Sequence, residues 1–225
     1  MKVAAVIPTF DEAEEVPRVL DHLAVLPGEW EVVVADGGSR DGTVDVARSH
    51  PLAPRVIERR GGRAAQLNAG VAASTGDPVL FLHADSRLPA GAFAALAGTG
   101  REVVGGNFAL RFDGGDRFSR VLGGFYRFQR RFGFYYGDSS VWVRRAAFER
   151  LGGYRAVPIM DDYDFVRRLE KSGPTACLPG PATTSARRWK RIGIVRTMLS
   201  WWVIRWLFIV GYPPEKLARM YRHVR

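Results

Sequence analysis

Short apolar segments alternate with segments of helical periodicity through the first hundred residues. The apolar segments are too short for typical helices and are flanked by turn residues, so they predict buried strands. These strands are expected at residues 2–7, 31–35, 55–58 and 79–85. The alternation of strands and helices indicates a parallel sheet with helices on both of its faces.

The first helix is predicted from apolar positions that recur three or four residues apart behind an acidic turn. These positions are Val16, Val19, Leu20 and Leu23. Asp11 is expected to cap this helix, with Glu14 completing a capping box. Two further helices are expected, one after the turn at 37–43 and one over residues 64–73.

Right-handed crossovers between parallel strands place the carboxyl ends of those strands on one rim of the sheet. Phe10, Asp36, the Gly61-Gly62 turn before Arg63, and Asp85 all follow such strand ends. We therefore expect these residues to converge at the edge where open α/β sheets bind ligands.

The second half of the chain mixes strands with aromatic, arginine-rich and acidic segments. Strands are predicted at 103–112, 141–143 and 175–178, and helices at 118–132, 145–151 and 161–171. Asp161 and Asp162 lie at the expected N-terminus of the last of these helices, where backbone amides favour ionised carboxylates.

A C-terminal segment, residues 187–225, has a different composition. Residues 197–214 are almost wholly apolar and are interrupted only by Arg205. The basic residues that bracket this stretch are Arg187, Arg188, Lys190, Arg191, Arg219, Arg222 and Arg225. Three interpretations stay open: helices in a membrane interface touching anionic headgroups, a helix packed on the catalytic domain, and a spanning helix. An arginine near the middle of a span costs about 2.5 to 3.5 kcal/mol.

Composition narrows the classes of partner. The formal net charge of +10 predicts an anionic partner, and a phosphorylated ligand, a lipid surface and nucleic acid all qualify on charge alone. No nucleic-acid reading module is recognisable, so no nucleic-acid partner is expected. The single cysteine, Cys177, excludes an internal disulfide framework and a cysteine-rich metal site.

Acidic residues and one arginine are the candidates for chemistry. Asp36 and Asp85 end predicted strands, where a carboxylate can accept hydrogen bonds from a nucleoside, bind Mg²⁺ or Mn²⁺, or simply cap a turn. Arg63 follows two glycines at a helix start, which suits either a phosphate or a solvated surface position. The Asp161-Asp162 pair can supply a general base towards an alcohol or merely compensate a helix dipole.

Several motifs, taken in order, resemble those of family 2 glycosyltransferases. They are Ile7-Pro8-Thr9-Phe10-Asp11-Glu12, Asp36-Gly37-Gly38-Ser39-Arg40-Asp41-Gly42-Thr43, Gly62-Arg63-Ala64-Ala65-Gln66-Leu67-Asn68-Ala69-Gly70, Leu82-His83-Ala84-Asp85 and Met160-Asp161-Asp162-Tyr163-Asp164. The chain most resembles the small bacterial members associated with radical-enzyme and selenium-domain gene neighbourhoods. The resemblance implies an α/β GT-A fold: a mostly parallel central sheet with flanking helices over residues 1–186, followed by C-terminal apolar and basic helices.

The resemblance also implies roles for individual residues. Residues 1–100 would form the nucleotide-binding half and residues 101–186 the acceptor half. Asp162 would be the catalytic base, and Asp85 would bind a divalent metal, Mg²⁺ or Mn²⁺. The residues implied in binding the nucleotide-sugar are Pro8, Thr9, Glu12, Asp36, Arg63, Ala84 and Asp85. Those implied at the acceptor site are Gly137, Asp138 and Asp161.

The function expected from the resemblance is inverting, metal-assisted transfer of a sugar from a UDP- or GDP-linked donor to an acceptor hydroxyl or phosphate. The acceptor can be lipid-linked or a small soluble molecule. A nucleotidyltransferase on a similar scaffold and a catalytically inactive, membrane-bound nucleotide-binding protein are the alternatives. The expected location is cytoplasmic, peripheral on the inner face of the cell membrane.

Overall fold

A computed structural model describes residues 2–186, 189–190 and 193–222. In this part of the chain one seven-stranded sheet has the order β3-β2-β1-β4-β6-β5-β7. The strands are β1 (Val3–Thr9), β2 (Trp30–Asp36), β3 (Arg55–Glu58), β4 (Val79–Phe81), β5 (Gly105–Phe112), β6 (Trp142–Val143) and β7 (Thr175–Thr184). All pairings are parallel except those of β6, which runs antiparallel to β4 and β5. The mostly parallel sheet predicted from the sequence is thus confirmed.

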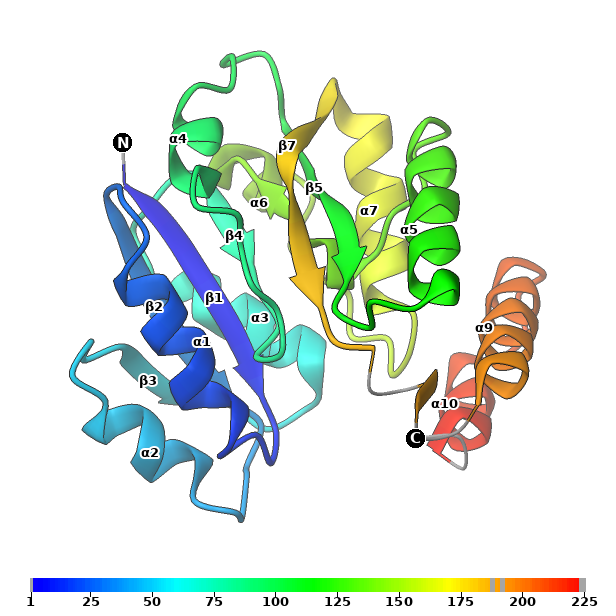
Figure 1. Ribbon diagram of the computed structural model, residues 1–225, viewed down its shortest axis with the longest axis horizontal. Helices are drawn as coiled ribbons and strands as arrows, with labels where there is room; N and C mark the ends of the chain where they lie inside the picture. Colours follow the sequence, from blue (N-terminus) through cyan, green and yellow to red (C-terminus); the bar gives the residue numbers. More distant parts are fainter. Residues whose placement is uncertain (1, 187–188, 191–192, 223–225) are drawn as a thin grey trace.

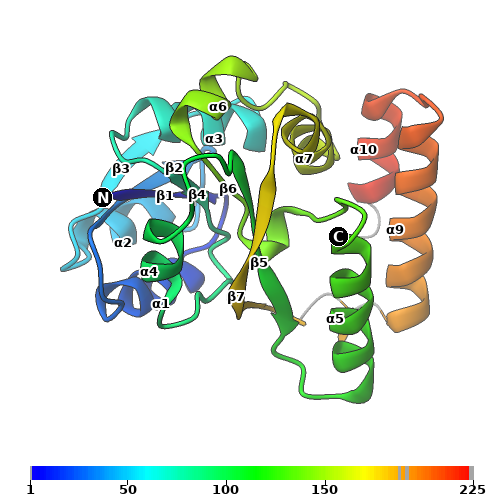
Figure 2. The same cartoon turned by 90° about the horizontal axis from the view of Figure 1, so that it is seen from above.

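Helices cover both faces of the sheet (Figure 2). One face carries α1 (Glu15–Ala24), α2 (Thr43–Ser49) and α4 (Ala92–Ala97). The other carries α3 (Arg63–Ala72), α6 (Arg145–Arg150) and α7 (Asp161–Ser172). In β1, Ala5 and Ile7 face the first layer while Ala4 and Val6 face the second, as the period of a strand requires.

A third apolar cluster joins the far end of the sheet to the C-terminal helices. Figure 1 shows α5 (Arg117–Arg130) standing beside β5, with α9 (Ile194–Ile209) and α10 (Pro214–Arg222) next to it. Leu122 of α5 and Trp189 are buried in this cluster, and Met198 and Trp201 of α9 pack against it. One side of α9 is therefore packed on the domain. None of the described helices has the length and apolar character needed to cross a membrane.

The predicted cap of α1 is wrong. The helix begins at Glu15, whereas Asp11 has a positive φ of 53° and its Oδ1 accepts a hydrogen bond from the Arg40 amide. Pro17 explains the shift, because proline has no N–H and is tolerated only in the first turn of a helix. A helix capped by Asp11 would have placed Pro17 in its second turn.

Two strands end at positions that the sequence did not predict. β4 ends at Phe81, four residues before Asp85, because β6 offers it only two paired positions. β7 continues to Thr184 despite Pro179 and Pro181, because it is an edge strand whose pairing with β5 shifts register at this point.

Candidate active site

The candidate site lies on the rim where the parallel strands end. β1, β2 and β4 run parallel, so the segments after Thr9, Asp36 and Phe81 leave the sheet on one side, as predicted. β6 runs in the opposite direction, so the short helix Gly137–Ser139 that precedes it lies at the same rim. The antiparallel strand is what brings Gly137 and Asp138 to the rim at which β1, β2 and β4 end.

Arg63 holds three separate segments together at this rim. Its Nη1 donates to Asp161 Oδ1 at 3.1 Å and lies 3.9 Å from Asp162 Oδ2. Its Nη2 lies 2.9 Å from His83 Nε2. Its Nη2 also lies so close to Gly137 that a Cβ there would come within 2.2 Å of it. The start of α3, the loop after β4, the turn before β6 and the start of α7 therefore meet around one guanidinium.

The two acids of the Asp161-Asp162 pair have different surroundings. Asp161 is buried, and burial raises the pKa of its carboxyl while the charge of Arg63 acts in the opposite direction. Asp162 is more open: its side chain is 17% exposed. Its Oδ2 accepts from the Gly137 amide at 2.8 Å and its Oδ1 from the Tyr163 amide at 2.8 Å. Of the two acids, Asp162 is therefore the one placed to meet a substrate.

Asp138 is a strongly perturbed carboxyl of the site. Burial, followed by the charges of Asp162 and Asp85, raises its pKa to about 7, and a hydrogen bond from Tyr126 opposes this shift. Within the described residues, Asp138 Oδ1, Asp161 Oδ2 and Arg63 Nε are buried atoms without a hydrogen-bond partner. Polar atoms left in this condition around one point are typical of a ligand site, because burying them unpaired costs stability.

Asp36 has its own hydrogen-bond network in the turn after β2. Its Oδ1 accepts from the Gly38 and Ser39 amides at 2.7 and 2.9 Å, and its Oδ2 from Thr9 Oγ1 at 3.1 Å and from the Ser39 hydroxyl. Burial alone would raise the pKa of Asp36, but these hydrogen bonds outweigh it and lower the pKa. The carboxylate is fully buried, and its hydrogen bonds to the Gly38 and Ser39 amides fix the backbone of the turn.

The other predicted donor-site residues lie around the ends of β1 and β4. Pro8 is half-buried, and the Glu12 amide donates to Thr43 Oγ1 at 2.9 Å. Ala84 is buried, so only its backbone can meet a ligand. Gln66 ties the ends of β1 and β2 together by donating to the carbonyls of Thr9 and Ala35 at 2.6 and 2.8 Å.

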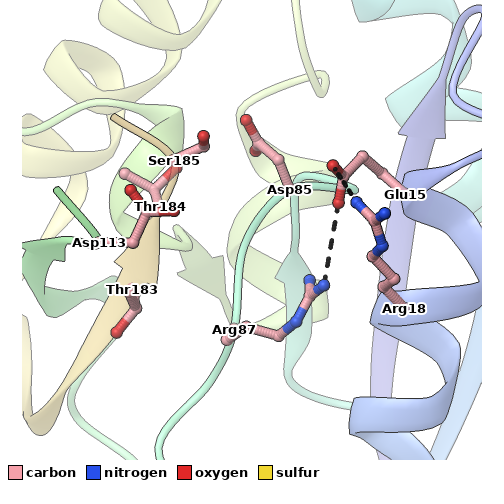
Figure 3. Close-up of a pocket in the computed structure, with 8 residues that line it drawn as sticks. All are labelled: Glu15, Arg18, Asp85, Arg87, Asp113, Thr183, Thr184 and Ser185. Atoms are coloured by element: carbon pink, nitrogen blue, oxygen red, sulfur yellow. Dashed lines mark hydrogen bonds and ion pairs between the residues drawn. The ribbon is translucent and has the colours of Figure 1, made fainter. Parts of the chain in front are cut away.

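Asp85 borders a polar cavity of about 250 Å³ that the sequence did not predict. Figure 3 shows Asp85 and Arg87 between side chains from α1 and side chains from the end of β7. The other lining residues are Glu15, Arg18, Asp113, Thr183, Thr184 and Ser185. The Arg87 and Thr183 backbones exchange two hydrogen bonds of 2.8 Å, which fix the loop after Asp85 to β7. Asp113 directly follows a predicted strand, which was the available signal for placing it on this rim.

The donor set around Asp85 suits a divalent cation held partly by its substrate. No group of three His, Cys, Asp or Glu side chains within the described residues is arranged to bind a metal ion. Mg²⁺ often takes only one or two protein carboxylates and completes its shell with phosphate oxygens and water. Asp85, with the unpartnered Oδ1 of Asp138 in electrostatic range, fits that pattern.

Comparisons with known sequences place the chain in a family. The sequence model of glycosyl transferase family 2 matches residues 4–152. Glycosyltransferase AglE of Haloferax volcanii is 32% identical over 126 residues, which are 50% of this chain and 41% of AglE. A PGL/p-HBAD biosynthesis glycosyltransferase of Mycobacterium bovis is 39% identical over 89 residues, 37% of this chain and 35% of that protein. The chain thus matches less than half the length of these relatives.

Solved structures share the fold. Mannosyltransferase PcManGT from Pyrobaculum calidifontis, in complex with GDP-Man and Mn²⁺, superposes with a TM-score of 0.68 at 25% identity, over 90% of this chain and 60% of that one. Glucosyl-3-phosphoglycerate synthase from Mycobacterium tuberculosis, with Mn²⁺, UDP and glucosyl-3-phosphoglycerate, gives 0.58 at 21% identity, over 88% and 79%. The architecture is the predicted GT-A fold, and the family match spans more than half of the chain, which therefore belongs to glycosyl transferase family 2.

Proposed function

We propose that this chain transfers a sugar from a nucleotide-diphosphate sugar to an acceptor hydroxyl or phosphate, with inversion at the anomeric carbon. The observation that carries the proposal is the meeting of Asp138, Asp161 and Asp162 around Arg63, at the rim where Asp85 also lies. Relatives support the donor class, because the solved structures include complexes with GDP-Man, UDP-GlcNAc and UDP.

In this proposal residues 1–100 bind the donor and residues 101–186 the acceptor. Pro8, Thr9 and Glu12 flank the nucleoside, and Asp36 holds the turn on which it rests. A direct contact of Asp36 with the base requires Ser39 or Gly38 to release the carboxylate first, since both oxygens are occupied. Arg63 faces the base or the diphosphate, with its free Nε available for one more acceptor.

Asp85 is the residue proposed to hold Mg²⁺ or Mn²⁺ on the diphosphate. The neighbours solved with Mn²⁺ support a divalent metal at such a site. When bound, the ion neutralises the negative charge of the leaving nucleoside diphosphate. The Arg87–Thr183 pairing keeps the Asp85 loop in place, and the Ala84 carbonyl accepts a hydrogen bond from Arg87 Nη1 at 3.3 Å.

Asp162 is the proposed general base. Hydrogen bonds from the Gly137 and Tyr163 amides hold its carboxylate in a fixed orientation. The acceptor hydroxyl gives its proton to Asp162 as its oxygen forms a bond to the anomeric carbon. The bond from that carbon to the phosphate oxygen breaks on the opposite face, and the nucleoside diphosphate leaves. Asp138, Gly137 and the buried Asp161 form the wall against which the acceptor lies.

Asp162→Asn tests this proposal against Asp45→Asn, an exposed acid on α2. Calorimetry with UDP and GDP in Mn²⁺ should give unchanged affinity for both variants, while sugar transfer is lost only in Asp162→Asn, because an amide cannot take the proton. Normal transfer by Asp162→Asn would remove this residue from the mechanism.

The product identifies the reaction class. Release of a nucleoside diphosphate supports sugar transfer, whereas release of pyrophosphate identifies the nucleotidyltransferase alternative. Nucleotide binding by the wild-type chain without release of either product would favour the inactive, membrane-bound alternative.

We also propose that α9 and α10 bring the chain to an anionic membrane surface on the cytoplasmic side, where the acceptor can be lipid-linked. The long apolar segment and the exposed basic residues Lys190 and Arg219 support this placement. Arg187, Arg188, Arg191 and Arg225, counted in the sequence as part of this basic surround, lie outside the described residues.

A further inference from the structure

Two helices expose apolar stripes at the same end of the molecule. On α5 and just beyond it the stripe is Val121, Phe125, Phe128 and Phe132; on α9 it is Val195, Leu199, Trp202, Trp206 and Ile209. Each of these side chains is at least 47% exposed. The spacing of three or four residues places each set along one line of its helix. Isolated exposed apolar residues are ordinary, whereas two aligned stripes of this size mark an interaction surface.

The stripes are not the faces that hold the helices to the domain. α5 buries Ser119, Leu122 and Gly123 against the sheet. α9 buries Thr197 and Ile204, and its inner side also carries Arg205. Figures 1 and 2 both show α5 and α9 as neighbours at the end of the molecule away from β3. We call the two stripes together the α5–α9 face.

The charges on α5 and α9 themselves are of one sign. Neither α5 nor α9 contains an Asp or Glu residue. Exposed arginines lie along the apolar line of α5 and at the start of α9: Arg117, Arg120, Arg127, Arg131 and Arg196. A second copy of the chain would bring these positive charges against one another, whereas anionic headgroups complement them.

Arg205 does not interrupt the apolar stripe of α9. Its guanidinium lies 4.8 Å from the ring centre of Phe134 and 6.0 Å from that of Tyr163, on the domain side of the helix. The exposed side of α9 carries Trp202 and Trp206, and tryptophan favours the boundary between lipid and water.

We propose that the α5–α9 face docks on the surface of a bilayer that contains anionic phospholipids, with α5 as a contact in addition to the C-terminal helices. The inference deepens the membrane part of the proposed function and does not depend on sugar transfer. The inner side of α9 contacts Tyr163, the neighbour of Asp162, through Phe208 and Arg205. Docking on this face therefore brings the bilayer to the acceptor side of the candidate site.

The test is flotation of the full chain with phosphatidylcholine vesicles that contain or lack phosphatidylglycerol. The variant Phe125→Ser/Phe128→Ser removes two rings from α5 and leaves the C-terminal helices intact. We expect binding to the anionic vesicles to become at least about tenfold weaker, because less apolar area enters the bilayer. The matched control is Val25→Ser, which removes a 77% exposed apolar side chain next to α1 and should bind like the wild type.

Further variants distinguish docking on an anionic bilayer from the alternatives. Arg120→Glu/Arg127→Glu should also weaken binding to anionic vesicles, and a thermal melt shows whether each variant folds. Asp162→Asn should float like the wild type, since docking does not require transfer. Equal flotation of the Phe125→Ser/Phe128→Ser variant and the wild type would exclude α5 from the contact. The proposed anionic surface would be overturned if the wild type bound neutral vesicles as strongly as anionic ones. It would also be overturned if the wild type formed a dimer and the Phe125→Ser/Phe128→Ser variant did not.

Discussion

Arg63 Nη1 lies 3.1 Å from Asp161 Oδ1, and this ion pair joins the start of α3 to the start of α7 across 98 residues of sequence. The Asp161 side chain is 10% exposed and that of Arg63 29% exposed. The pair therefore exists in a mostly enclosed place, where an unpartnered charge is costly.

Replacing Arg63 by alanine should destabilise the protein by about 2–4 kcal/mol, because Asp161 then remains buried without its cation. Urea unfolding at neutral pH measures the change. The control is Arg155→Ala, which removes a 67% exposed side chain that pairs with Asp164 and should cost about 0.5 kcal/mol or less. Similar losses in the two variants would show that enclosure of the Arg63 pair has no energetic effect.

Gly137→Ala should weaken the same junction. A Cβ at Gly137 meets Arg63 Nη2 at 2.2 Å and His83 Nε2 at 3.0 Å, so Arg63 must move from its acids. We expect a loss of about 1–3 kcal/mol in thermal unfolding. Gly124→Ala on α5 is the matched substitution in open space and should stabilise the helix by about 0.5–1 kcal/mol. Tolerance of Gly137→Ala would mean that Arg63 relocates without cost.

Asp138 should make stability fall as the pH rises. Its pKa is 3.8 when unperturbed and about 7 in the fold, so between these values the folded chain holds a proton that the unfolded chain has lost. The cost of ionising Asp138 in its site is then fully present above pH 7. Asp138→Asn should remove that cost and stabilise the metal-free protein by about 2 kcal/mol at pH 8, with little change near pH 3.5. Denaturant unfolding at the two pH values measures the difference; an equal effect at both would contradict the assigned shift.

Asp36 should have the opposite dependence. Its folded pKa lies below the unperturbed 3.8, so its stabilisation is present above 3.8 and is lost as the pH falls through the folded value. Asp36→Asn should cost about 1–3 kcal/mol at pH 7, because the amide cannot accept all the hydrogen bonds that the carboxylate receives. The difference between variant and wild type should shrink below pH 3.8. A pH-independent difference would indicate a steric effect instead.

The fold was largely predictable because its signals are local. The apolar run at residues 79–85 and the helical spacing of Val16, Val19, Leu20 and Leu23 each follow from burial of one face of an element. Errors arose where two local signals competed. Asp11 looked like a cap, but Pro17 fixed the helix start. The strand predicted at 175–178 continues to Thr184, because an edge strand accommodates Pro179 and Pro181.

The sequence singled out several residues of the candidate site, but it did not predict how they are arranged. Asp36, Arg63, Asp85 and Asp162 were identified from strand ends and helix starts. Some of their neighbours belong to no motif, namely Tyr126, Asp113 and Thr184. These residues lie at the site only because β5, β6 and β7 end or begin at the same rim.

The sequence by itself determined the alternation of elements, the acids at their ends and the basic, apolar tail, because these depend on residues near one another in the chain. Only the tertiary structure decided that Asp161 is enclosed and Asp162 open, and that Arg205 faces Phe134 instead of the exposed side of α9. The reason is that burial and the partner of a charge are set by segments distant in the sequence, through a strand order that local pattern does not encode.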